Sequence, residues 1–246
     1  MNKKYLIIST GRTGTLFFAD LINALRPQVM AVHESRYSRL FCILSHFTLA
    51  RLFPRSLLRF LWRKLNQHQH AEIIYDANNM LYALPYLIPE AFAEYKILHI
   101  FRTPDDYAES HLRFSKQRLR SFIANYLIPL WQPNGYFHGK ILLWQWYRMS
   151  KRERFLWVWL FKNRLMRSYQ RRFNYLSVSF DALFRTNVND WRVSVLKFLD
   201  VPLEQKTDIE ELFKQQRNQT QTVSLNDNIQ LKDLAELIAE QKCAQR

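Results

Sequence analysis

The residues best suited to bind a phosphate lie near the start of the chain. Two of its four glycines fall close together, between a short apolar run and an amphipathic segment, in the string Ser9, Thr10, Gly11, Arg12, Thr13, Gly14 and Thr15. A turn between a strand and a helix directs backbone N–H groups and the helix N-terminus at one point, which favours an anion. Arg12 adds a fixed cation, and Thr13 and Thr15 add hydroxyl donors. The string therefore predicts a phosphate-binding turn, with an ordinary threonine-capped turn as the alternative.

A second anion-binding pattern follows the apolar run Lys96 to Phe101. Arg102 ends this run, Pro104 comes two residues later, and Ser110 comes eight residues after the arginine. We predict a helix from Pro104, because proline is tolerated at the first helical position, and a capping box between Thr103 and Asp106. Arg102 would then lie at the carboxyl edge of a sheet, with Ser110 two turns along the helix.

These two strings resemble the two nucleotide-binding motifs of the PAPS-dependent sulfotransferases, which use 3′-phosphoadenosine 5′-phosphosulfate (PAPS). Gly14 and Thr15 match the family's 5′-phosphosulfate loop, and Arg12 stands where the family has lysine or arginine. The resemblance implies that Arg12 stabilises the departing phosphate, and that Arg102 and Ser110 hold the 3′-phosphate. Thr103 departs from the family, which usually has aspartate there. The resemblance covers about residues 4 to 202.

The base that would accept a proton from the acceptor has two candidates. His33 and Glu34 follow the short apolar run Val29 to Val32, and the carboxyl ends of parallel strands converge on the ligand crevice. The string His33, Glu34, Ser35, Arg36 is similar to the segment that carries the catalytic glutamate in tyrosylprotein-type members. That similarity favours Glu34, while the ordinary pKa of histidine favours His33. The asparagines Asn78 and Asn79 could line the acceptor site or cap a helix.

The hydrophobic pattern predicts an α/β protein, a P-loop-like three-layer α/β/α fold with a central parallel sheet. Short apolar runs predict strands at 4–9, 29–32, 72–75, 96–101 and 174–179. Longer amphipathic segments predict helices at 16–26, 38–65 with a break at Pro54, 78–88, from 104, 140–172 as one helix or a pair, 189–199 and 231–239. His99 falls inside a strand, where a core histidine is expected.

The chain of 246 residues suits one sulfotransferase-like domain spanning 1–246. We expect helical insertions at 38–70 and 119–172, both rich in arginine and aromatic residues, and a polar helical tail at 204–246. The two insertions could bury their aromatic faces, or they could contact an anionic membrane surface or a sugar chain.

The charge and the cysteine content limit which partners and which cellular location are expected. The chain has 36 Lys and Arg against 21 Asp and Glu, a formal charge of +15, which favours anionic partners. The two cysteines, Cys42 and Cys243, are far apart, which argues against a disulfide framework or a zinc site. The prediction is a cytoplasmic protein without a metal, with peripheral membrane contact left open and no nucleic acid expected.

The sequence thus predicts transfer of a sulfuryl group from PAPS to an acceptor hydroxyl or amine, such as a carbohydrate or a lipid-linked group. A phosphate-loop kinase is the first alternative, but no lysine follows Gly14, and Asp76 is its only candidate for a metal ligand at a strand end. A basic membrane-binding or nucleic-acid-binding module is the second, and it leaves both motifs unexplained.

Overall fold

The computed structural model describes residues 3–11, 14–66, 73–117, 123, 130–185, 190–202 and 213. All of them belong to one compact unit, Met1–Gln216. Residues 217–246 make up a second unit outside the described residues, and with it the helix predicted at 231–239. Arg12 and Thr13 of the glycine turn also lie outside the described residues.

The described residues form a five-stranded, fully parallel sheet, which confirms the predicted fold class. Its strands in spatial order are β2 (Met30–His33), β3 (Ile73–Ala77), β1 (Lys3–Ser9), β4 (Tyr95–Phe101) and β5 (Asn174–Ser179). The chain leaves β1 toward β2 and β3 and later returns on the other side of β1 as β4. The order of the strands therefore reverses beside β1, and ligands of open parallel sheets bind at the carboxyl ends of the strands at such a point.

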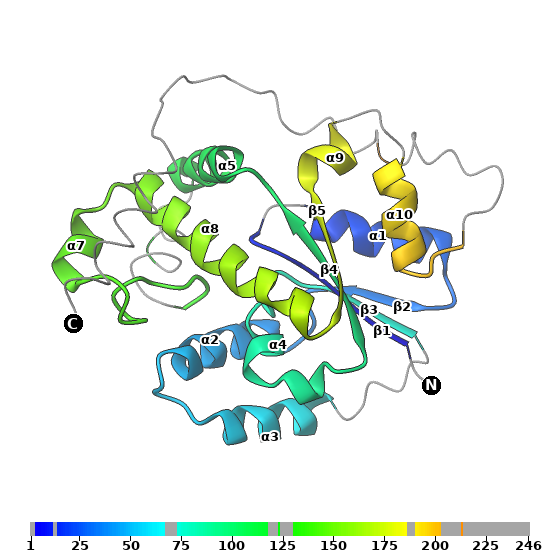
Figure 1. Ribbon diagram of the computed structural model, residues 1–246, viewed down its shortest axis with the longest axis horizontal. Coiled ribbons are helices and arrows are strands. Elements are labelled where there is room, and N and C mark those ends of the chain that lie inside the picture. Colours follow the sequence, from blue (N-terminus) through cyan, green and yellow to red (C-terminus); the bar gives the residue numbers. More distant parts are fainter. Residues whose placement is uncertain are drawn as a thin grey trace. The chain divides into compact units, whose positions relative to one another are not determined.

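Helices cover both faces of this sheet (Figure 1). One face packs against α1 (Thr15–Leu25), α9 (Phe180–Phe184) and α10 (Asp190–Phe198), and its core includes Tyr5, Ile7, Phe18, Ile100 and Val195. The other face packs against α2 (Ser38–Leu49), α3 (Arg55–Asn66), the short α4 (Leu84–Leu87) with η1 (Pro89–Ala91), and the end of α8 (Lys151–Arg167) with η3 (Ser168–Arg171). Its core includes Leu6, Ile8, Phe41, Trp62 and Met166. Successive residues of β1 thus enter different cores, as the alternation of side chains along a strand requires.

One predicted helix differs from the observed one, and for a second segment the structure selects between the two predicted alternatives. The segment 78–88 is helical only over α4. The side chain of Asn78 accepts a hydrogen bond from the N–H of Met80 (3.1 Å) and forms a turn, and Pro89 disfavours helix at Ile88. The segment 140–172 is divided into α7 (Leu143–Arg148) and α8, the second of which starts at a capping box between Ser150 and Glu153. The predicted break at Pro54 is confirmed by the gap between α2 and α3.

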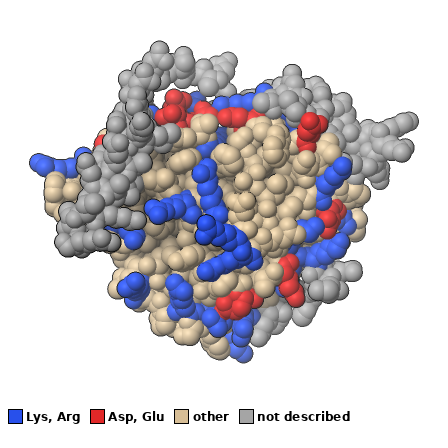
Figure 2. Space-filling model, viewed as in Figure 1, with Lys and Arg blue, Asp and Glu red and all other residues tan. Residues whose placement is uncertain are grey.

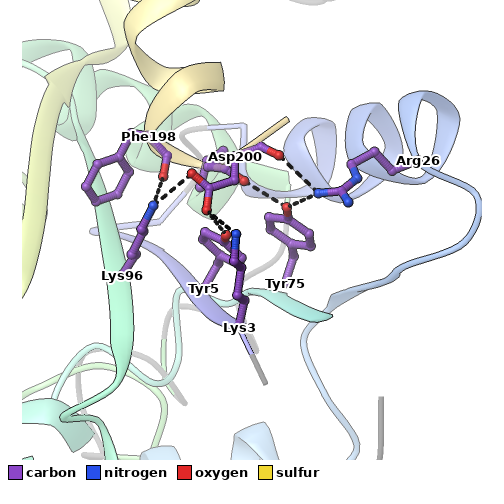
Figure 3. A network of polar contacts seen from close by, with 8 residues as sticks. Lys3, Tyr5, Arg26, Tyr75, Lys96, Phe198 and Asp200 are labelled. Carbon is purple, nitrogen blue, oxygen red and sulfur yellow. Dashed lines mark hydrogen bonds and ion pairs between the residues drawn. The ribbon is translucent and has the colours of Figure 1, made fainter. Parts of the chain in front are cut away.

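The amino edge of the sheet is held together by Asp200, which follows α10 (Figure 3). Its carboxylate accepts hydrogen bonds from Tyr5 Oη (2.6 Å), Lys96 Nζ (2.9 Å) and Lys3 Nζ (3.2 Å). Its backbone carbonyl accepts one from Arg26 at the end of α1 (3.0 Å). These contacts join β1, β4, α1 and α10 at the edge opposite to the one that carries the candidate site.

Candidate active site

The glycine turn begins directly after β1. Gly11 has φ +114° and Gly14 has φ +81°, a region of backbone conformation that other residues rarely adopt. The N–H of Gly11 donates to Ser9 Oγ (3.1 Å), and the carbonyl of Gly14 accepts the first helical hydrogen bond of α1, from Phe18 (3.2 Å). The first turn of α1 carries no acidic residue, so no side chain of that turn neutralises the positive end of the helix dipole.

The second motif lies on the neighbouring strand. Arg102 follows β4, and α5 (Pro104–Gln117) begins two residues later, with the side chain of Ser110 only 6% exposed. The guanidinium of Arg102 lies 3.9 Å from the centroid of the Phe180 ring, and Trp159 Nε1 on α8 donates to the Arg102 carbonyl (2.9 Å). Residues from α8 and α9 thus hold Arg102 at the carboxyl edge.

The capping box predicted before α5 is half formed. Thr103 Oγ1 accepts a hydrogen bond from the N–H of Asp106 (3.3 Å), as predicted. The carboxylate of Asp106 instead pairs with Arg185 after α9 (2.8 Å), because this arginine offers a charged partner.

The two motifs lie side by side. β1 and β4 pair in parallel with Ser9 opposite Ile100. Gly11 and Arg102 each come two residues after one member of this pair. A Cβ atom added to Gly11 would lie 3.9 Å from Nε2 of His111, the residue after Ser110. Helix α5 therefore passes close to the glycine turn, and both motifs lie where the strand order reverses.

The two candidate bases differ in their contacts. His33 ends β2, and its Nε2 lies 3.2 Å from Oγ1 of Thr15, the first residue of α1. Glu34 has φ +53°, and its N–H donates to the carbonyl of Ala77 at the end of β3 (3.4 Å). His33 thus contacts the glycine turn region directly, while Glu34 lies over the end of β3.

A buried carboxyl group lies beneath Glu34. Asp76 on β3 is 7% exposed, and burial raises the pKa of its carboxyl to about 7, with the charge of Glu34 adding to the shift and hydrogen bonds from Asn78 and Ser35 opposing it. Its Oδ1 has no hydrogen-bond partner among the described residues. The sequence pattern suggests Asp76 only as a metal ligand, and the one signal for a further role is a charged residue inside an otherwise apolar strand.

Asn78 and His99 both have structural contacts near the site. Asn78 is fully buried and donates to Ser38 Oγ (2.5 Å), so it builds the turn after β3. His99 is a core residue, as expected, with Nδ1 2.7 Å from Tyr175 Oη, and burial lowers its pKa to about 3.

A hollow of about 680 Å³ lies away from the two motifs. Its lining comes from the end of α1 and the starts of β2 and β3, at the amino edge: Asn23, Arg26, Gln28, Val29, Met30, Ala31 and Ile73. Within the described residues, no group of three or more His, Cys, Asp or Glu side chains could hold a metal ion. No described helix has both the length and the apolarity needed to cross a membrane.

Basic side chains gather over α8. Figure 2 shows Lys and Arg side chains running as a band across the face that this helix covers, among few acidic ones. Between Glu153 and Asp181 the chain has no acidic residue, and Arg164, Arg167 and Arg171 are exposed. This face would attract an anionic ligand or surface.

Comparison with known proteins gives a match in structure alone. No family model matches the chain, and no curated protein matches it in sequence. Among solved structures it is similar to a sulfotransferase domain from the curacin biosynthetic pathway, with 12% identity, a TM-score of 0.48, and coverage of 83% of this chain and 76% of that one. It is similar to mouse sulfotransferase SULT7A1 in a complex with PAP, with 14% identity, a TM-score of 0.49, and coverage of 86% of this chain and 63% of that one. It is also similar to a sulfotransferase from Alicyclobacillus acidocaldarius, with 14% identity, a TM-score of 0.47, and coverage of 86% of this chain and 89% of that one.

Proposed function

We propose that this chain is a PAPS-dependent sulfotransferase. The observation that carries the proposal is that the glycine turn after β1 and the helix that bears Ser110 approach each other at the carboxyl edge, with Gly11 beside His111. Two separate anion-binding elements lie at the point where the order of the strands reverses, and this arrangement suits a single nucleotide with phosphate groups at both ends. A simple basic surface module would not require this arrangement.

The residues divide the nucleotide between them in this proposal. The turn of Gly11, Arg12, Thr13, Gly14 and Thr15 binds the 5′-phosphosulfate through backbone N–H groups, the arginine and the hydroxyls. Arg102 and Ser110 bind the 3′-phosphate. The contact with the Phe180 ring leaves the charge of Arg102 intact and limits the rotamers of this arginine. Less side-chain entropy is therefore lost when Arg102 binds the phosphate.

In the transfer step an acceptor oxygen or nitrogen attacks the sulfur in line with the S–O bond to the 5′-phosphate. That bond breaks, the sulfuryl group moves to the acceptor, and adenosine 3′,5′-bisphosphate leaves with the bond's electron pair, stabilised by Arg12. The proton of the acceptor goes to a base. We assign this role to Glu34, because the Nε2 of His33 is already engaged with Thr15 Oγ1. The basic face over α8 favours an acidic acceptor, such as an anionic carbohydrate or lipid-linked group.

Thermal unfolding with three ligands tests the nucleotide assignment. Adenosine 3′,5′-bisphosphate at about 100 times its dissociation constant should stabilise the chain by about 2.7 kcal/mol, whereas ATP with Mg²⁺ and a DNA oligomer should not match it. Stabilisation by ATP with Mg²⁺ alone would instead support the kinase alternative, and stabilisation by DNA alone would support the nucleic-acid-binding module.

Two substitutions test the residue assignments. Arg102→Ala should weaken binding of the bisphosphate by about 10- to 100-fold, the usual value of hydrogen bonds to a charged group, and should leave adenosine 5′-monophosphate binding nearly unchanged. The matched control is Arg164→Ala, which removes an exposed arginine of α8. Glu34→Gln should spare bisphosphate binding and slow turnover, and unchanged turnover would remove Glu34 as the base.

A further inference from the structure

A lysine lies buried directly behind the glycine turn. Lys162 on α8, the helix that crosses one face of the sheet in Figure 1, is 1% exposed. Its Nζ donates to the carbonyl of Thr10, the residue before Gly11, over 3.4 Å. The ammonium also lies 4.6 Å from the centroid of the Tyr82 ring.

Within the part of the chain that the structure describes, this ammonium has no carboxylate partner. None of the ion pairs between described residues includes Lys162. Two groups act on it directly, the thiol of Cys42 on α2 and the ring of Tyr82 before α4. Tyr82 in turn interacts with His46 on α2 and with Tyr107 on α5, and Tyr107 contacts His111. Burial raises the pKa of the Cys42 thiol to about 12 and that of Tyr82 well above its usual value, so neither is an anion near neutral pH.

A buried cation without a counter-ion is costly, because the ammonium loses its hydration and gains little in return. One long hydrogen bond to a carbonyl and one ring contact do not replace that hydration. A second polar atom at this place is also unsatisfied, since Thr10 Oγ1 is buried and has no partner among the described residues. Thr10 starts the turn whose glycines and helix N-terminus suit an anion, and Lys162 contacts this residue from α8.

We propose that Lys162 is the buried counter-charge for the phosphosulfate end of the nucleotide held by the glycine turn. This inference rests on the proposed function and adds to it a binding residue remote from both motifs. The lysine acts in two ways: its charge attracts the anion, and its contact with the Thr10 carbonyl fixes the residue from which the turn starts. Arg12 is a permanent cation, whereas Lys162 can titrate.

The proposal makes nucleotide binding depend on protons. Burial lowers the pKa of Lys162 to about 8, although Cys42 opposes the shift. A bound anion favours the charged form and raises this pKa, so above pH 8 binding must take up a proton. At pH 8.5 about three quarters of the free lysine is neutral, and uptake should approach about three quarters of a proton per nucleotide. At pH 6.5 Lys162 is already charged and contributes none.

The test is calorimetric titration of the full chain with adenosine 3′,5′-bisphosphate at pH 6.5 and 8.5, in buffers of different ionisation enthalpy. At pH 8.5 Cys42 and Tyr82 do not titrate, and histidines and phosphates contribute little. Lys162→Met should abolish the uptake and weaken binding at least tenfold. Lys162→Arg should retain affinity at pH 8.5 without the uptake. Lys64→Met, which removes an exposed lysine of α3, is the control and should behave as the parent chain.

The thermal stability of the free chain distinguishes a binding role from a structural one. Because methionine removes an unpaired buried charge, Lys162→Met should unfold at the same or a higher temperature without ligand, while binding the nucleotide less well. A variant that loses stability and keeps both affinity and proton uptake would overturn the inference and leave the proposed function intact. A parent chain that does not bind the bisphosphate at all would overturn the proposed function itself.

Discussion

The carboxylate of Asp200 offers a test of how the sheet is held together, through the substitution Asp200→Asn. Asp200 has φ +51°, and asparagine tolerates this left-handed conformation as well as aspartate does. The substitution therefore keeps the shape of the side chain and its backbone and removes only the charge that Tyr5, Lys96 and Lys3 contact.

The expected loss follows from the pKa of this group. Partial burial alone would raise it, but hydrogen bonds from Tyr5, Lys96 and Lys3 outweigh burial and lower the pKa of Asp200 from 3.8 to about 2. A shift of this size corresponds to an upper limit of about 2.4 kcal/mol. The side chain is 31% exposed, so solvent screening reduces the expected loss to about 1–2 kcal/mol. For a chain of this length that is a fall in Tm of about 2–8 °C.

Urea unfolding at pH 7 and pH 3 measures this loss. Because the folded pKa is lower than the unfolded one, the stabilisation is fully present above the unfolded pKa of about 3.9 and is lost as the pH falls through about 2. The difference between the parent chain and Asp200→Asn should thus fall to about half by pH 3. Asp105→Asn, at a carboxylate that is 64% exposed, is the control and should cost well under 1 kcal/mol. An equal loss at both pH values would show that the charge of Asp200 is not what stabilises the fold.

Two further predictions concern Asp76 and the surface of α7. Burial raises the pKa of Asp76 to about 7, so the folded protein is less stable once the pH rises through 7 and the buried carboxyl group must ionise. The substitution Asp76→Asn removes this ionisation. In urea titrations it should raise the free energy of unfolding at pH 8 and leave it unchanged at pH 4. On α7, Leu143 and Trp144 are 55% and 56% exposed, and Arg148 lies 5.4 Å from the Trp144 ring. If this surface contacts an anionic membrane, the chain should co-sediment with anionic vesicles more than with zwitterionic ones, and the double substitution Leu143→Ser and Trp144→Ser should reduce that difference. Equal sedimentation with both vesicle types would exclude this contact.

The elements of this fold could be predicted because their signals are local. The strand ending at Ser9 is a short apolar run stopped by glycine, and the strand ending at Phe101 is stopped before a proline, so both ends were predicted correctly. Pro54 separated α2 from α3 for an equally local reason. The failure at 78–88 is also instructive, since the side chain of Asn78 competes with the helical hydrogen bonds that the apolar pattern suggested.

The surroundings of the candidate site could not be predicted, because they join residues far apart in the chain. Lys162 contacts Thr10 across 152 positions, and nothing in the composition of α8 separates this lysine from the exposed basic residues around it. The raised pKa of Asp76 likewise depends on burial under Ser35 and Asn78, which the sequence does not specify. The order of the strands at β1 decides which strand ends meet, and short apolar runs do not encode that order.

The distribution of charge between the two edges of the sheet favours the carboxyl edge as the functional one. At the amino edge the carboxylate of Asp200 is paired with two lysines and a tyrosine (Figure 3), whereas Arg26 contacts only neutral oxygens there. At the carboxyl edge the described residues include Asp76 with an unsatisfied oxygen and Lys162 without a carboxylate, and burial shifts the pKa of each toward neutrality. Such groups reduce the stability of the free protein, and a fold keeps them where a ligand compensates them. If ligand binding at this edge does compensate them, excess nucleotide should stabilise the parent chain more than it stabilises Lys162→Met, by about 1.4 kcal/mol for each tenfold by which that substitution weakens binding.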